Sequence, residues 1–224
     1  MSFYEYLADN HRRLFIEACG HVGAVLVCTL LAAVLGVLIG LVASRSERAG
    51  DLATAATGAF LTVPTLALVG LLIPVTGLGL APTLAALTLC GLLPIVRNSL
   101  VALRTGDPSL VDAARGIGMS RWARFVRVEL PLAWPSILTG IRASTRLLVG
   151  VAAVAAYASG PGLGNEIFRG LGSPDSENAL NEVLAGTLGI FALSVLFDAA
   201  YLLLERLTVP RRIARPVQPE ERTT

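Results

Sequence analysis

One polar stretch organises this chain: Asp112-Ala113-Ala114-Arg115-Gly116-Ile117-Gly118, continuing through Met119-Ser120-Arg121-Trp122 and closing on Leu130-Pro131. Strongly apolar segments flank it on both sides, whereas the stretch itself carries four arginines, a tryptophan and a phenylalanine. An ordinary connecting loop would not combine helix-forming residues with anchoring aromatic side chains. We therefore interpret the stretch as a docking element, a short helical part of a membrane protein that a soluble partner binds.

Composition places the chain among membrane proteins with several spans. Its 224 residues are 54% hydrophobic and 15% charged, with a mean hydropathy of +0.69, whereas soluble domains contain about 25% charged residues. The formal charge of +2 is too small to indicate a nucleic-acid partner. No cleavable signal peptide is predicted, because the first residues include Glu5, Asp9 and Glu17 and lack a basic start. The expected fold class is an all-α polytopic membrane protein.

Uncharged runs predict five membrane-spanning helices. The run Val22–Ala43 would be about 33 Å long as a helix, enough to cross a bilayer. The uncharged run from Leu52 to Val96 would form a helix of about 67 Å, so it must fold back, and Pro74–Gly79 supplies the turn residues. We expect an interfacial segment at 1–21, a transmembrane domain at 22–205 and a cytoplasmic basic tail at 206–224. Within the domain, the expected spans are 22–43, 52–73, 80–96, 132–158 and 183–204, and the docking loop is 97–131.

The distribution of arginine predicts the orientation in the membrane. All 18 basic residues are arginine. Thirteen of them lie in the turn 44–51, the loop 97–131 and the tail, which share one side, and three lie in the N-terminal segment and the outer segment 159–182. Loops on the cytoplasmic side carry the excess of positive charge. The docking loop and the C-terminus are therefore expected in the cytoplasm, and the N-terminus outside.

The docking element is predicted to consist of two short helices separated by a glycine. The first spans Ser109–Arg115 and is broken by Gly118, and Ser120 caps a second helix that runs toward Glu129. Pro131 then ends the polar part. A simpler alternative is a loop that lies on the membrane with its arginines facing anionic lipid. That alternative explains the arginines, but not a pair of alanines followed by a glycine at fixed spacing.

These residues resemble the EAA loop of permease subunits in bacterial ABC importers that work with binding proteins. That motif reads Glu-Ala-Ala, three residues, Gly, nine residues and Ile-x-Leu-Pro. Asp112 stands here for its glutamate and Val128 for its isoleucine. The resemblance implies a type I ABC importer permease fold in which the docking loop is the coupling helix. It also implies that six residues couple the chain to an ATPase: Asp112, Ala113, Ala114, Gly118, Leu130 and Pro131.

Within that superfamily the chain looks closest to the osmoprotectant branch. The residues that carry this resemblance are Val63–Leu68, Leu92–Asn98, Gly116–Trp122, Gly140–Arg142 and Gly162–Gly164. The resemblance implies an importer of glycine betaine, carnitine, choline or proline betaine. A permease for methionine or another small amino acid is the alternative within transport. A non-transporting membrane scaffold is the alternative from another class.

Energy for import is expected to come from another subunit. A Walker A loop requires a lysine, and the chain has none, so we expect ATP to bind a separate cytoplasmic subunit and expect no catalytic residue or cofactor in this chain. The resemblance implies two such ATP-binding subunits, a second permease subunit that is identical or paralogous, an extracytoplasmic substrate-binding protein, and a place in the bacterial cell (inner) membrane. Cys19, Cys28 and Cys90 lack metal-ligand spacing and are expected to be buried thiols.

Three charged residues lie within the expected spans. Arg142 and Asp198 are expected at the same depth, where an unpaired charge costs about 3 kcal/mol on insertion scales, and Arg146 lies one turn deeper on the face of Arg142. We predict a structural ion pair between neighbouring helices, with a gate in the pathway as the alternative. The cluster Gly160–Gly164 is interpreted as a flexible outer turn that contacts a partner or closes the pathway.

Overall fold

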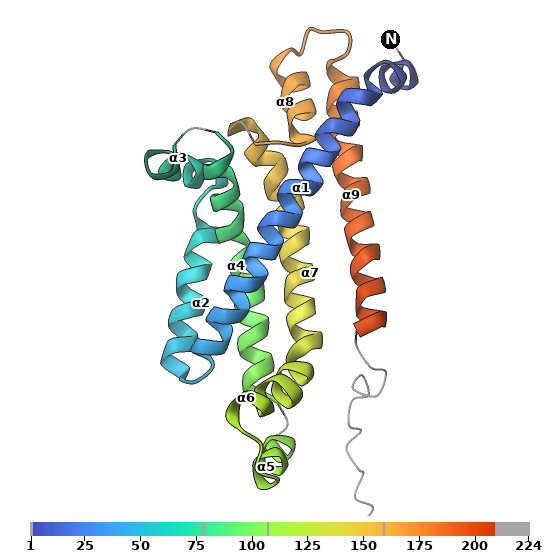
Figure 1. The fold of residues 1–224 in the computed structure, drawn as a ribbon. Coiled ribbons are helices and arrows are strands. Elements are labelled where there is room, and N and C mark those ends of the chain that lie inside the picture. Colours follow the sequence, from blue (N-terminus) through green and yellow to red (C-terminus); the bar gives the residue numbers. More distant parts are fainter. Residues whose placement is uncertain (1, 78, 107, 159, 209–224) are drawn as a thin grey trace, which may run out of the picture.

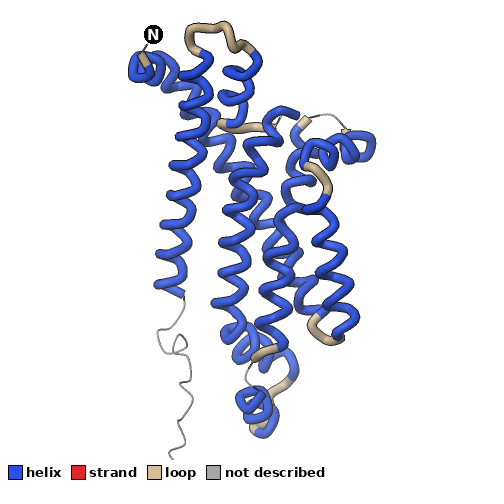
Figure 2. The backbone as a smooth tube through the Cα atoms, turned by 180° about the vertical axis from the view of Figure 1, so that it is seen from behind, coloured by secondary structure: helices blue, strands red, loops and turns tan. Residues whose placement is uncertain are grey.

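The structure, a computed structural model, describes residues 2–77, 79–106, 108–158 and 160–208. Within these ranges it consists of helices without a strand, as expected for the all-α class (Figure 2). The helices form an elongated bundle (Figure 1), with the N-terminus and α8 (Gly164–Gly172) at one end and the docking helices α5 (Pro108–Gly116) and α6 (Arg121–Arg124) at the other. Most of the expected basic tail, 209–224, lies outside the described residues.

Four described helices are long and apolar enough to cross a membrane, and a bent pair of helices, taken as one broken span, would be a fifth. The four are α1 (Phe3–Ala43), α4 (Leu80–Arg104), the continuous stretch Arg121–Ala158 that contains α7 (Leu130–Ala155), and α9 (Ala179–Thr208). α4 lies at the centre of the bundle and packs most extensively on α1 and α7. The expected all-α membrane fold is confirmed.

The expected interfacial segment 1–21 is continuous with the first span. α1 runs without interruption from Phe3 to Ala43. It begins with a capping box, in which the Ser2 hydroxyl accepts a hydrogen bond from the Glu5 amide and the Glu5 carboxylate accepts one from the Ser2 amide at 2.8 Å. This reciprocal cap satisfies backbone donors at the start of the helix. The polar N-terminal segment is therefore the first half of α1.

The expected second span, 52–73, is two helices in the structure. α2 (Glu47–Thr62) and α3 (Thr65–Thr76) meet at an angle of 102°. Between them, Val63 and Pro64 adopt extended backbone conformations. A proline lacks a backbone donor and disfavours helical torsions in the residue before it, so the helix ends there. As a result α3 lies crosswise toward the end of the bundle that holds the N-terminus and α8, which we call the outer end (Figure 1).

Small residues hold α1, α4 and α7 together at close approach. At Gly40 an added Cβ would lie 2.5 Å from the Ser99 Cβ, and at Gly91 it would lie 2.8 Å from the Ser144 hydroxyl oxygen. That hydroxyl donates a hydrogen bond of 2.8 Å to the Gly91 carbonyl. Such residues let membrane helices approach backbone to backbone, where dispersion and interhelical hydrogen bonds stabilise the contact. α4 also continues to Arg104, well past the expected end of its span at residue 96.

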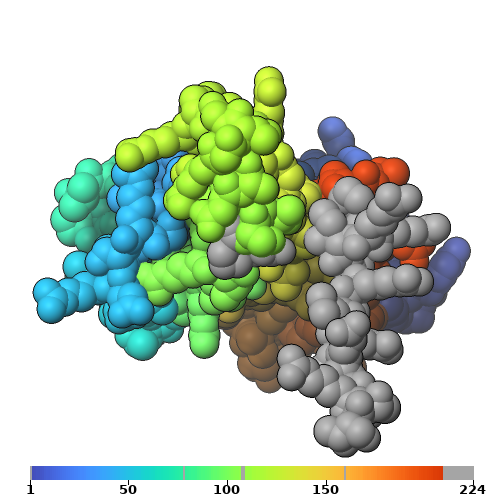
Figure 3. Space-filling model, turned by 90° about the horizontal axis from the view of Figure 1, so that it is seen from below, coloured from blue at the N-terminus to red at the C-terminus, as the bar shows by residue number. Residues whose placement is uncertain are grey.

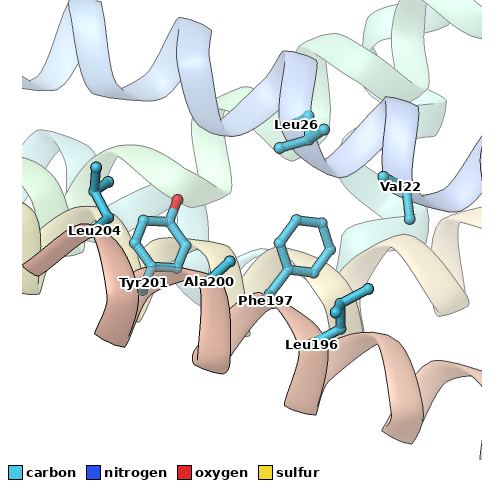
Figure 4. Close-up of a pocket in the computed structure, with 7 residues that line it drawn as sticks. All are labelled: Val22, Leu26, Leu196, Phe197, Ala200, Tyr201 and Leu204. Carbon is cyan, nitrogen blue, oxygen red and sulfur yellow. The ribbon is translucent and has the colours of Figure 1, made fainter. Parts of the chain in front are cut away.

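α9 is attached to the bundle mainly at its outer end. Its buried residues are Asn181, Ala185 and Gly186, all near its first turn. Farther along, an apolar groove of about 380 Å³ separates α9 from α1, and Phe197 of α9 faces Leu26 of α1 across it (Figure 4). The inner part of α9 therefore presents an apolar surface to lipid or to another subunit.

Candidate functional site

The docking helices project from one end of the bundle. Seen from below, α5 and α6 lie over the middle of this end and stand out from the surrounding helix ends (Figure 3). This end lies opposite the N-terminus (Figure 1), and the arginine distribution predicts that it is cytoplasmic. The two helices protrude from the rest of the chain, as a docking element for a soluble partner must.

The turn between α5 and α6 has the geometry that the glycine pattern predicts. Gly118 has a φ of 79°, in the left-handed region, and its amide donates to the Arg115 carbonyl at 2.9 Å. The next amide donates to the Ala114 carbonyl at 3.1 Å, so the last carbonyls of α5 are satisfied much as in a Schellman helix end. Ser120 then accepts a hydrogen bond from the Ala123 amide and caps α6. α5 itself is one residue longer at each end than the predicted helix.

One side of α5 presents apolar residues to solvent. Leu110 and Ala113 are exposed on adjacent turns, and Ile117, just beyond the helix, is 80% exposed. Ala114, by contrast, is 3% exposed and is buried within the chain. The alanine pair therefore does not act as a unit, because Ala113 faces outward and Ala114 inward. Sequence reasoning missed Ile117 as a candidate contact residue, although an exposed apolar side chain in a polar stretch indicates a binding surface.

The docking element continues into the fourth span without a break. α6 passes through a π-helical turn, Phe125–Glu129, directly into α7. The Leu130 amide donates to the Phe125 carbonyl five residues back. This wider turn precedes Pro131, whose ring would otherwise interrupt an α-helical ladder. Contrary to expectation, Pro131 lies inside the first turn of α7 and does not end the polar helix. α6, the π-helical turn and α7 therefore form one continuous helix, which we call the rod.

A second polar cluster lies between α7 and α9. Asp198 accepts hydrogen bonds from Arg142 Nε at 3.3 Å and from Arg146 Nε at 2.6 Å. Arg142 Nη1 also lies 4.0 Å from a Glu205 carboxylate oxygen. The side chains of Arg142, Arg146 and Asp198 are 22%, 50% and 31% exposed in the single chain. The Asp198 carboxylate thus pairs with guanidinium groups on two successive turns of α7. The cluster is partly exposed at the surface of the chain.

A third cluster, which we call the outer latch, joins α8 to the start of α1 through Tyr6, Arg13, Glu17, Glu166 and Arg169. Glu166 is fully buried and accepts hydrogen bonds from the Tyr6 hydroxyl at 2.6 Å and from Arg13 Nε at 2.7 Å. Arg169 donates to Glu166 at 2.6 Å and to Glu17 at 3.3 Å. Burial alone would lower the pKa of Arg169, but the hydrogen bonds and charges of Glu166 and Glu17 outweigh burial and raise it. No local pattern signals this cluster, because Arg13 and Glu166 are 153 residues apart.

Replacing Glu166 by glutamine is expected to loosen α8 from α1. Glutamine keeps an acceptor for Tyr6, but it leaves Arg13 without an anion and Arg169 with only its 3.3 Å contact to Glu17. Removing one partner of a buried pair costs about 3–5 kcal/mol, and the partial exposure of both arginines reduces the expected loss to about 2 kcal/mol. Thermal unfolding of the purified protein in detergent measures this loss. Glu17→Gln, which removes only the 3.3 Å contact, is the matched control, and equal shifts for both variants would contradict a central role for Glu166.

The glycine cluster 160–164, interpreted above as a flexible outer turn, is packed against α1. Gly162 has a φ of 130°, and an added Cβ there would lie 2.5 Å from His21 Nδ1. His21 is fully buried, and its Nε2 lies 3.1 Å from the Val149 carbonyl oxygen of α7. A residue without a Cβ leaves room for the imidazole and permits the left-handed backbone. The cluster therefore packs the outer segment against α1.

The cysteines and acidic residues of the described ranges do not form a metal centre. No group of three or more His, Cys, Asp or Glu side chains in these ranges is arranged to hold a metal ion. Cys28 and Cys90 are buried, whereas Cys19 is exposed and departs from the expectation of buried thiols. The polar clusters of the chain instead pair their charges with one another.

These features define a class of protein: a helical membrane subunit of a transporter, with a docking element fused to one of its spans. The chain belongs to the family of binding-protein-dependent transport system inner membrane components, which matches residues 32–209. It is therefore a multi-pass membrane component of an ABC transport system. In this family the ATPase is a separate subunit.

Comparison with known proteins gives the relatives and the fold neighbours. The Osmoprotectant import permease protein OsmW of Salmonella typhimurium is 36% identical, over 93% of this chain and 96% of its own. The Glycine betaine/carnitine/choline transport system permease protein OpuCB of Bacillus subtilis is 30% identical, over 92% of this chain and 93% of its own. A solved structure of the MetNI methionine ABC transporter, in an inward-facing conformation, superposes with a TM-score of 0.75 at 19% identity, over 88% of this chain and 96% of its own. At that identity the likeness shows the fold alone.

Proposed function

We propose that this chain is the permease subunit of an ATP-driven importer of osmoprotectants, quaternary ammonium compounds such as glycine betaine, carnitine, choline or proline betaine. The observation that carries the proposal is the match to OsmW, which covers nearly the whole of both chains. OpuCB, matched almost as fully, is named for three of these compounds. A permease for methionine or another small amino acid is the second candidate, and the fold shared with MetNI is compatible with it.

Coupling to ATP hydrolysis runs through the docking helices in this proposal. The apolar side of α5, with Leu110, Ala113 and the neighbouring Ile117, lies in a groove of a cytoplasmic ATPase subunit. Because α6 and α7 form one rod, a displacement of α5 turns the fourth span and is not absorbed by a loop. Two ATPase subunits closing on ATP therefore tilt the spans and alternate access to the pathway. ATP binds these partner subunits, and this chain needs no cofactor of its own.

A second permease subunit, identical or paralogous, completes the pathway. The inner part of α9 has an exposed apolar surface, and Arg146 is half-exposed in the single chain. A guanidinium within the spans is not stable against lipid tails and needs a protein surface or a water-filled pathway beside it. We assign this face of α7 and α9 to the centre of the dimer. Asp198 and its two arginines then form a structural cluster next to the pathway.

Selection among substrates belongs to a separate extracytoplasmic binding protein. Quaternary ammonium groups are bound by cages of aromatic side chains, and aromatic residues make up 6% of this chain. The aromatic pairs in contact among the described residues are Trp122 with Phe125 in the docking element and Tyr157 with Phe168 at the outer end. Neither pair lies midway along the spans. The outer end, with the N-terminus and α8, faces the binding protein, and the docking helices face the cytoplasm.

Reconstitution of the chain with the ATPase and binding protein of its system tests this function. ATP-dependent uptake and the stimulation of ATP hydrolysis are measured in proteoliposomes with glycine betaine, carnitine, choline, proline betaine and methionine. We expect stimulation by at least one quaternary ammonium compound and none by methionine. Stimulation by methionine alone would favour the amino-acid permease. Failure of any ATPase to co-purify with the chain would favour a non-transporting scaffold.

A further inference from the structure

A basic cavity lies where the inner end of α1 meets the docking element. Its volume is about 750 Å³, and its walls come from Ser44 and Arg45 after the first span and from α5, α6 and the π-turn. Leu41 and the aromatic pair Trp122 and Phe125, whose ring centroids are 6.1 Å apart, add apolar surface. The cavity thus joins two parts of the chain that are far apart in the sequence.

Positive charge in the basic cavity exceeds the negative charge that lines it. Glu129, the one carboxylate among the described lining residues, pairs with Arg124 at 2.6 Å. Arg115 also has an ion pair, because its Nη1 lies 3.1 Å from Oδ1 of the exposed Asp112 on α5. Arg45 and Arg121 also line the cavity, and neither has an ion pair within the described part of the chain. An anionic group in the cavity would neutralise these two guanidinium groups.

The depth of the basic cavity favours a lipid as its occupant. The apolar run of α1 ends at Ala43, so Arg45 lies at the level where the headgroups of the bilayer begin. Tryptophan beside arginine is a composition typical of the membrane interface. Apolar surface next to guanidinium groups fits a molecule that carries both a phosphate and acyl chains.

The alternative occupant of the basic cavity, an acidic surface of the ATPase, fits the geometry less well. The apolar side of α5 that docks on the ATPase includes Ala113, whereas Arg115 lines the cavity. Two residues along an α-helix correspond to a rotation of about 200°, so the two side chains lie on opposite sides of α5. Binding the ATPase on one side therefore leaves the cavity on the other.

We propose that the basic cavity binds the phosphate headgroup of an acidic phospholipid of the cytoplasmic leaflet. The phosphate bridges Arg45, after α1, and Arg121 of α6, and the acyl chains lie along Leu41 and Trp122. Basic pockets beside spans on the cytoplasmic side are suited to such headgroups. The bound lipid ties the docking element to α1 and so supports the rod formed by α6 and α7. The choice of leaflet rests on the orientation in the proposed function.

The test uses the purified complex of permease and ATPase, with phosphatidylglycerol as the probe. Two double variants remove the same charge: Arg45→Gln with Arg121→Gln in the cavity, and Arg48→Gln with Arg127→Gln at exposed positions outside it. Mass spectrometry measures the lipid retained in detergent, and uptake is compared in phosphatidylcholine vesicles with and without phosphatidylglycerol. The cavity variant is expected to retain about tenfold less phosphatidylglycerol than the parent and the control. Its uptake is expected to lose the response to phosphatidylglycerol.

Three results would overturn the proposal. Equal retention in both double variants would mean that general surface charge attracts the lipid. Displacement of phosphatidylglycerol by inorganic phosphate at equal concentration would indicate a site for a free anion. Loss of the ATPase from the cavity variant alone would mean that the arginines contact the ATPase. Lipid retention is measured without transport, so its outcome is distinct from a failure to import osmoprotectants.

Discussion

The Gly118→Val variant is expected to hydrolyse ATP with about tenfold less uptake per ATP than the parent. Gly118 has a φ of 79°, which a β-branched residue adopts only at a cost of about 1–2 kcal/mol or more. Within the described residues no atom lies within 4 Å of an added Cβ, so the cost comes from the backbone and not from crowding. We expect the chain to relieve this backbone strain by opening the turn between α5 and α6. The docked helix then moves without turning the rod, and about 1.4 kcal/mol is enough for a tenfold effect.

Side-by-side assays of uptake and ATP hydrolysis in proteoliposomes measure this ratio. Gly118→Asn is the matched control, because asparagine adds a side chain of similar size but enters the left-handed region far more readily than valine. It is expected to keep most of the coupling. Normal uptake by the Gly118→Val complex would rule out transmission through a fixed turn.

Removal of the Asp198 carboxylate, as in Asp198→Ala, is expected to reduce the assembled complex in the membrane about tenfold or more. The substitution leaves Arg142 and Arg146 without their anion, and an unpaired charge within a span costs about 3 kcal/mol on insertion scales. Glu205 lies 4.0 Å from Arg142 and its side chain is 51% exposed, so it is poorly placed to take over. Fluorescence-detected size exclusion of a tagged complex from membranes measures the amount that assembles.

Two further changes separate a structural cluster from a gate. Glu205→Gln removes a distant carboxylate from the same region and is expected to have little effect on assembly. Neutralising the two arginines and the aspartate, with Arg142→Gln, Arg146→Gln and Asp198→Asn together, removes the unpaired guanidinium groups and leaves only the half-exposed Glu205 charged. It is expected to restore assembly. Uptake by this restored complex would support the structural role that we propose. Assembly without uptake would contradict it and identify the cluster as a gate.

Local chemistry was sufficient to predict several parts of the molecule. The apolar runs identify the membrane-spanning segments, because bilayer thickness and the need for internal backbone hydrogen bonds leave a helix as the available solution. The turn at Gly118 and the cap at Ser120 depend on partners within a few residues, so their pattern is visible without a structure. The pairing of Arg142 with Asp198 follows from their similar depth, since a charge within a span needs a partner.

The class of fold, the docking turn and the charges that must pair could all be predicted without a structure, because each depends on near neighbours or on the bilayer. Which distant residues meet follows from the packing of the whole chain, as Glu166 meets Tyr6 across 160 residues. Packing also distinguishes similar residues: Pro64 marks a bend of 102°, whereas Pro131 stays within a helix behind a π-helical turn. Local interactions limit each segment to a few conformations of similar energy. Packing against the rest of the chain selects among them.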